Sequence, residues 1–203
     1  MLKRGGHIKL WKPIVIIVLL DQLLKLYIKT TFEVGESFSV FPWFIIYFVE
    51  NNGFAFGLEF FGAHGKLLLT FTRIFFVVFI CLWLKKILNN TGPQSRPLVW
   101  AFILIVSGAI GNIIDSVFYG LIFGYAPVFF GKVVDMFYFP ILTGTYPSWF
   151  PFLGGEEFVF FRYIFNIADS AIVISIFIII WTYIKNPPTE STEGNDERTT
   201  DQN

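Results

Sequence analysis

The sequence of 203 residues contains one cysteine, two histidines and few charged side chains. The single cysteine, Cys81, excludes an internal disulfide and argues against a thiolate metal site. His7 and His64 are far apart and not at the spacing of metal ligands, so the sequence does not predict a zinc protease. The formal net charge is zero, which argues against nucleic acid as a partner. We therefore expect chemistry that needs neither a metal nor a cofactor.

What the chain has in abundance is hydrophobic residues, which make up 55% of it. A soluble domain of this size would carry more than 15% charged residues, so we expect a membrane protein. Several segments are long and apolar enough to cross, as helices, a hydrocarbon core about 30 Å thick. These expected transmembrane helices cover approximately 13–31, 66–84, 97–119 and 164–184.

The first expected span is the least hydrophobic and contains Asp21 and Lys25, which can pair at i and i+4 of a helix. No small-x-small cleavage site follows it, so we expect an uncleaved span. Basic residues gather before this span, between the second and third spans, and after the fourth. The positive-inside rule then predicts that both termini are cytoplasmic. We expect one membrane-embedded domain over residues 1–185 and a disordered cytoplasmic tail over 186–203.

The two longer connections, roughly 32–65 and 120–163, would then face outward. The run from Phe41 to Val49 is too short to cross a membrane, is rich in aromatic and β-branched residues, and is followed by the turn signal Asn51-Asn52-Gly53. It predicts a small sheet on the outer leaflet. We thus expect a mainly α membrane protein, with four transmembrane helices, a small extracytoplasmic β-sheet platform and an extracytoplasmic loop or flap.

Acidic side chains give the sharpest functional signal, because an ionisable group at membrane depth is costly and usually has a function. Asp115 and Asp169 lie at the outer ends of two expected spans, and Asp135 lies in the loop between them among apolar neighbours. Two carboxylates held close together share one proton, so that one can act as a base and the other as an acid. The sequence therefore predicts acid/base chemistry at the outer membrane surface.

Structural roles for the same residues stay open at this point. Asn166 could cap the fourth helix, and Asp169 could stabilise its first turn through the helix dipole. Asp115 could pair with a nearby lysine or arginine. Asp21 with Lys25 is better suited to support than to catalysis, and Asn51 with Gly53 could be only a turn.

A set of short motifs occurs in a distinctive order along these segments. They are Asp21-Gln22 with Lys25, Asn51-x-Gly53-x-Ala55-Phe56, Gly111-Asn112-x-x-Asp115, Val134-Asp135, and Phe165-Asn166-x-Ala168-Asp169-Ser170-Ala171. Together with four spans, they make the chain, up to about residue 185, resemble the lipoprotein signal peptidase family, also called signal peptidase II. The resemblance implies an aspartic endopeptidase of the bacterial inner membrane, with its site near the periplasmic face. Such an enzyme removes the signal peptide from prolipoproteins before the cysteine that carries a diacylglyceryl group.

The resemblance also implies residue roles. Asp135 and Asp169 would be the catalytic acids. Residues that bind substrate or support the acids would be Asp21, Lys25, Asn51, Gly53, Asn112, Asp115 and Asn166. The partners would be lipid-modified prolipoproteins and membrane lipid, with no nucleic acid, and we expect a monomer.

The chain departs from the family pattern in two places. The family commonly has arginine directly after the acid at Asp115, whereas this chain has Ser116, so another cation, Arg162 or Lys132, is expected to be the charge partner. The interval between the two expected catalytic acids is also unusually long. It contains an insertion around residues 141–161 rich in proline, glycine and aromatic residues, which could form an outer flap.

Two other functions compete with that of a protease. A small proton-coupled transporter would use buried carboxylates to relay protons, but it calls for acids spread across the membrane and broken helices at its middle. A non-catalytic membrane chaperone would account for a sheet and a tail. It would not account for acids and amides gathered at one depth.

Overall fold

The computed structural model describes residues 11–52, 62–90 and 96–186. Gly53, the residues expected to continue the first outer sheet after it, the basic residues Lys3, Arg4 and Lys9, and the tail from residue 187 lie outside the described residues.

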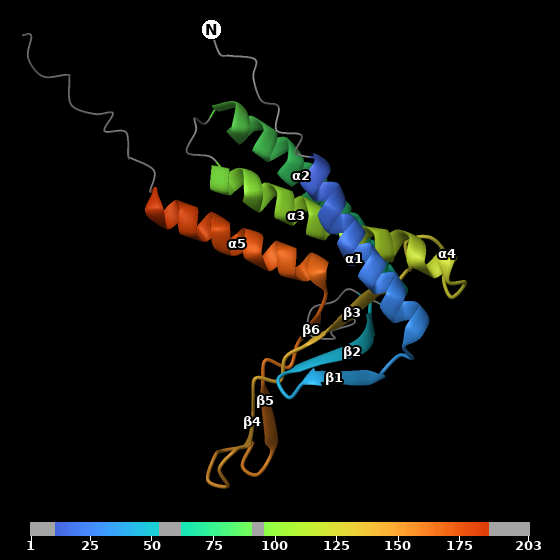
Figure 1. Cartoon of the computed structure of the whole chain (residues 1–203), viewed down its shortest axis with the longest axis vertical. Coiled ribbons are helices and arrows are strands. Elements are labelled where there is room, and N and C mark those ends of the chain that lie inside the picture. The colour runs from blue at the N-terminus through green and yellow to red at the C-terminus, as the bar shows by residue number, and fades with distance from the viewer. Residues whose placement is uncertain (1–10, 53–61, 91–95, 187–203) are drawn as a thin grey trace, which may run out of the picture.

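Helices make up most of the described chain (Figure 1). They are α1 (Trp11–Thr31), α2 (Gly62–Asn90), α3 (Arg96–Ile114) and α5 (Ile167–Lys185). After α3, a π-helical turn, η3 (Asp115–Tyr119), leads into the short α4 (Gly120–Ile122). Within the described residues, 3 helices are long and apolar enough to cross a membrane, over His64–Trp83, Arg96–Ile122 and Ile167–Lys185. The fold class is therefore confirmed as mainly helical, with three membrane-capable helices.

α3 is the central helix, because it packs against α1, α2 and α5. Small residues allow this close approach. At Gly111, an added Cβ would lie 2.6 Å from Asp21 Oδ2 and 3.1 Å from the Cβ of Ala168, so a larger residue would push α1 and α5 away. The glycine thus brings the polar residues of three helices together at one level.

A small antiparallel sheet lies at one end of the helices (Figure 1). Its strand order is β1-β2-β3-β6. The strands are β1 (Ser37–Phe41), β2 (Phe44–Asn51), β3 (Val133–Tyr138) and β6 (Ile164–Phe165). The insertion forms a separate hairpin of β4 (Leu142–Thr145) and β5 (Glu157–Phe160). The predicted small sheet is confirmed.

The position of Asp135 corrects one prediction. It was expected in a loop, but it lies in β3, a strand paired with β2 on one side and β6 on the other. The run from Val133 to Tyr138 is β-branched and aromatic around the acid, which suits a buried strand. An apolar cluster of Ile28, Phe48, Tyr119, Val134 and Met136 fixes this strand against α1 and η3.

Candidate active site

Asn166 connects the two expected catalytic acids. It is the N-cap of α5, where its Oδ1 accepts a hydrogen bond from the Asp169 backbone N–H at 2.9 Å. Its Nδ2 donates to Asp135 Oδ1 at 2.6 Å and to the Val134 carbonyl at 3.2 Å. One buried amide therefore holds an acid from a strand and an acid from a helix. We call Asp135 and Asp169 the acid pair.

Two further amides orient the acid pair. Asn51, at the end of β2, donates from Nδ2 to Asp135 Oδ2 at 3.0 Å. Asn112, near the end of α3, donates from Nδ2 to Asp169 Oδ1 at 2.7 Å. Both oxygens of Asp135 thus accept a hydrogen bond, and these bonds fix the plane of its carboxyl group.

The two acids differ in their surroundings. Asp135 is buried, whereas Asp169 is partly exposed. Burial and then the negative charge of Asp169 raise the pKa of Asp135 to about 7. Two interacting acids, one of them with a pKa of about 7, can share one proton near neutral pH.

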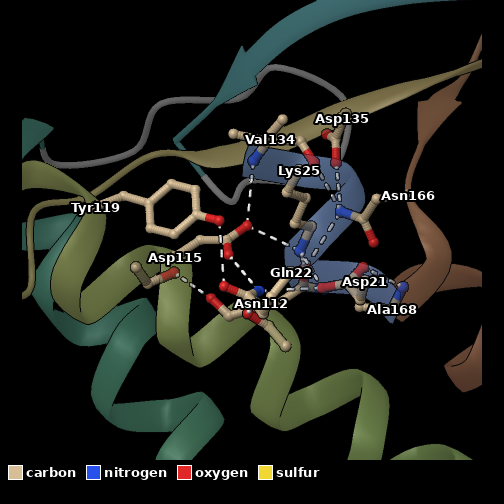
Figure 2. Close-up of polar contacts among 12 residues, drawn as sticks. Asp21, Gln22, Lys25, Asn112, Asp115, Tyr119, Val134, Asp135, Asn166 and Ala168 are labelled. Carbon is tan, nitrogen blue, oxygen red and sulfur yellow. Dashed lines mark hydrogen bonds and ion pairs between the residues drawn. The ribbon is translucent and has the colours of Figure 1, made fainter. Parts of the chain in front are cut away.

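A buried lysine supports the acid pair from α1 (Figure 2). Lys25 has 0% side-chain exposure, and its Nζ lies 2.9 Å from Asp21 Oδ2 and 2.8 Å from Asp115 Oδ2. The same Nζ donates to Asn112 Oδ1 at 3.0 Å, so three acceptors surround the ammonium group. Asp21 also accepts from the Ala168 backbone N–H at 2.9 Å, which ties α1 to the first turn of α5.

Gln22 and Tyr119 belong to this network, but sequence reasoning gave neither a role. Gln22 Nε2 donates to Asp115 Oδ1 at 2.9 Å, and its Oε1 accepts from the Tyr119 hydroxyl at 3.1 Å. Asp115 Oδ2 also accepts from the Val134 N–H at 3.2 Å, which links η3 to β3. A signal existed for both: Gln22 is a polar residue inside an apolar helix, and Tyr119 lies four positions after Asp115.

The charge partner of Asp115 differs from the expected one. Asp115 pairs with Lys25, whereas Lys132 pairs with Glu50 at 3.0 Å and Arg162 is an exposed residue between β5 and β6. The arginine that reaches this region is Arg73 of α2, whose Nη1 donates to Ser116 Oγ at 3.2 Å. Sequence reasoning missed it, although a charged residue inside an apolar span was a signal.

The predicted residues that the structure describes form one hydrogen-bonded network. It contains Asp21, Lys25, Asn51, Asn112, Asp115, Asp135, Asn166 and Asp169. Two structural alternatives are also present in it, because Asn166 does cap α5 and Asp115 does pair with a lysine. Within the described parts of the chain, no group of three or more His, Cys, Asp or Glu side chains is arranged to hold a metal ion.

Comparisons of the sequence with known proteins point to one family. A family model described as signal peptidase (SPase) II matches residues 13–185. A lipoprotein signal peptidase of Porphyromonas gingivalis strain ATCC 33277 is 44% identical over 185 residues, covering 84% of this chain and 80% of that protein. A lipoprotein signal peptidase of Amoebophilus asiaticus strain 5a2 is 34% identical over 184 residues, covering 85% and 77%. A solved structure described as a bacterial membrane enzyme is 26% identical with a TM-score of 0.59, covering 88% of this chain and 94% of its own.

Proposed function

Because the chain belongs to the signal peptidase II family, we propose that it is an aspartic endopeptidase that removes signal peptides from prolipoproteins. The cut would fall before a cysteine that carries a diacylglyceryl group. The observation that carries the catalytic part is the Asn166 side chain, which contacts Asp135 and the Asp169 backbone together. Two acids held in this way, in a membrane protein, suit hydrolysis of a peptide without a covalent intermediate.

In the proposed reaction, the ionised Asp169 takes a proton from a water molecule, whose oxygen attacks the scissile carbonyl carbon. The protonated Asp135 donates its proton to the carbonyl oxygen, so a neutral tetrahedral diol forms. The carbon–nitrogen bond then breaks, the leaving amine takes the proton held by Asp169, and one diol hydroxyl returns its proton to Asp135. One water is consumed, and the acid pair ends as it began.

We propose that the acid pair faces the extracytoplasmic side of the bacterial inner membrane, with both termini cytoplasmic. Arg96 begins α3 and Lys185 ends α5, at the ends of these helices far from the acid pair, which supports this orientation under the positive-inside rule. We further propose one membrane-embedded domain to residue 185 and a cytoplasmic tail after it.

We propose that α1 is the fourth transmembrane helix. Its charged residues Asp21 and Lys25 are buried against α3, whereas apolar residues such as Leu19, Leu20 and Leu23 are more than half exposed. A helix with its charges inside the bundle and leucines outside suits contact with lipid. The sheet would then rest on the outer leaflet, with the enzyme acting as a monomer.

The test is cleavage by the purified full-length protein. A diacylglyceryl-modified prolipoprotein and its unmodified precursor are incubated with it, and mass spectrometry identifies the new N-terminus. We expect cleavage before the modified cysteine only. Absence of cleavage, with substrate-dependent proton uptake into proteoliposomes, would instead support the transporter.

The pH dependence follows from the acid Asp135. Because burial and Asp169 raise its pKa to about 7, it holds the proton it must donate below that pH and loses it above. We therefore expect kcat/KM for the lipid-modified substrate to fall as the pH rises through about 7. A profile that stays level from mildly acidic to strongly alkaline pH would contradict the donor role of Asp135.

The hairpin of β4 and β5 suits a flap that contacts lipid or the lipid-modified substrate. It extends beyond the sheet (Figure 1), and in the turn between its strands Trp149 is 77% and Phe152 103% exposed. Changing both to serine removes apolar area that binding would bury, so we expect KM to rise about tenfold with kcat within twofold. Glu157→Gln, on the same hairpin, is the matched control. An unchanged KM in the doubly substituted protein would remove the flap from substrate binding.

A further inference from the structure

Arg73 is a cation inside the apolar span of α2, and the mechanism above gives it no role. The span covers His64–Trp83, and its neighbours Phe71, Phe75 and Phe76 are more than half exposed, as residues facing lipid would be. Arg73 is more buried than these phenylalanines, and its side chain reaches α3. A guanidinium at membrane depth has a high cost in free energy. The groups that it contacts within the bundle therefore indicate its role.

The contact of Arg73 with Ser116 connects it to the acid pair through three hydrogen bonds. Arg73 Nη1 donates to Ser116 Oγ at 3.2 Å, and Ser116 Oγ donates to the Asn112 carbonyl at 2.8 Å. Asn112 in turn donates from its side chain to Asp169 Oδ1 at 2.7 Å. Ser116 and Asn112 are both buried, so this connection is protected from water.

Three acids lie within electrostatic reach of Arg73. Its guanidinium interacts electrostatically with Asp169 of α5, Asp135 of β3 and Asp115 of η3. Lys25 of α1 also acts on Asp135, but its ammonium group is in contact with Asp21, Asp115 and Asn112. Lys25 is therefore in direct contact with the supporting carboxylates Asp21 and Asp115, and Arg73 adds a second positive charge that acts on both acids of the pair.

We propose that Arg73 is a positioning residue that orients Asp169 through Ser116 and Asn112 and adds positive charge beside the acid pair. The proposal rests on the proposed protease function. In this role Arg73 takes no part in the proton transfers. It acts through its charge and through the hydrogen bonds that begin at Ser116.

Loss of the Arg73 charge should displace the pH–activity profile in a defined direction. Without a nearby cation, Asp135 binds its proton more tightly, so the pH at which activity falls moves upward. For the loss of one unit charge that acts on a carboxyl group in the interior of a protein, the displacement is about one pH unit. A purely structural role of Arg73 would lower activity without moving the profile.

The experiment measures kcat and KM against pH for the full-length protein and Arg73→Gln, with a diacylglyceryl-modified prolipoprotein. We expect Arg73→Gln to lose about tenfold in kcat at its own pH optimum, because Asp169 is less well oriented, and its profile to be displaced upward by about one unit. Arg73→Lys retains the charge and should keep the wild-type profile. The matched control is Arg96→Gln, which replaces an exposed arginine at the far end of α3 and should change neither kcat nor the pH profile.

The outcomes separate this proposal from the function on which it rests. Thermal unfolding in detergent tests folding, and Arg73→Met, which an apolar span accommodates, replaces Arg73→Gln if that variant does not fold. A neutral variant whose profile stays at the wild-type pH, or moves to lower pH, overturns the role of Arg73. Wild-type protein that leaves the modified substrate uncut overturns the protease function instead.

Discussion

Asp169→Asn and Asp135→Asn are each expected to lower kcat for the lipid-modified prolipoprotein by about a thousandfold or more. An asparagine at 169 is similar in size, but it cannot take a proton from water. An asparagine at 135 can still accept a hydrogen bond from Asn166, but it has no acidic proton to donate. Binding should change much less than turnover, because both substitutions preserve the shape of the site. The measurement is kcat and KM from the rate of signal-peptide release.

The matched control is Glu33→Gln, which removes a carboxylate from an exposed position after α1. It should leave kcat unchanged. Thermal unfolding of all three variants should resemble the wild type closely enough to show that the bundle is assembled. Near-normal turnover in either aspartate variant would remove that acid from the mechanism.

The acids could be predicted from the sequence because membrane topology restricts their depth. When α3 and α5 cross in opposite directions, a carboxylate at the end of one and a carboxylate at the start of the other lie at the same level. Asp115 and Asp169 follow from this rule alone. The N-cap role of Asn166 follows as well, because an asparagine directly before an apolar helix satisfies free N–H groups.

Other parts of the site depend on pairing between distant segments and could not be predicted. Nothing local in the sequence shows that Asn51 and Asp135 meet. The register of β2 with β3 brings them together, with Val49 opposite Asp135 and Asn51 opposite Val133. The strand at Asp135 could not be predicted because a short apolar run that contains a charged residue resembles the sequence of a loop.

The direction in which a side chain leaves a helix could not be predicted either. Arg73 could have extended toward the lipid headgroups, and only the packing of α2 against α3 brings it to Ser116. The choice of Lys25 as the partner of Asp115 depends on α1 approaching α3 at Gly111. Where two helices cross is set by the sum of many contacts, so the sequence alone does not indicate which cation meets which acid.

Lys25→Met is expected to cause the largest loss of stability. The substitution leaves Asp21 and Asp115 buried and close together with no cation between them. Removing one partner of a buried ion pair costs about 3–5 kcal/mol, because the remaining charge has no compensation. For a protein of this size, such a loss lowers the unfolding temperature by about 10 °C or more. Thermal unfolding in detergent measures it, and Lys12→Met, an exposed lysine on the same helix, should unfold close to the wild type.

A triple variant distinguishes the charge of Lys25 from its bulk. Lys25→Met combined with Asp21→Asn and Asp115→Asn has no buried charge at these positions, while the side chains keep nearly the same volume. Buried ion pairs replaced as a group often cost little, whereas a pair broken on one side costs much. We therefore expect the triple variant to regain most of the lost unfolding temperature. Equal losses in the single and triple variants would mean that Lys25 acts by packing alone. Recovery of the unfolding temperature would mean that α1 is held to α3 mainly because the Lys25 ammonium group neutralises the two buried carboxylates.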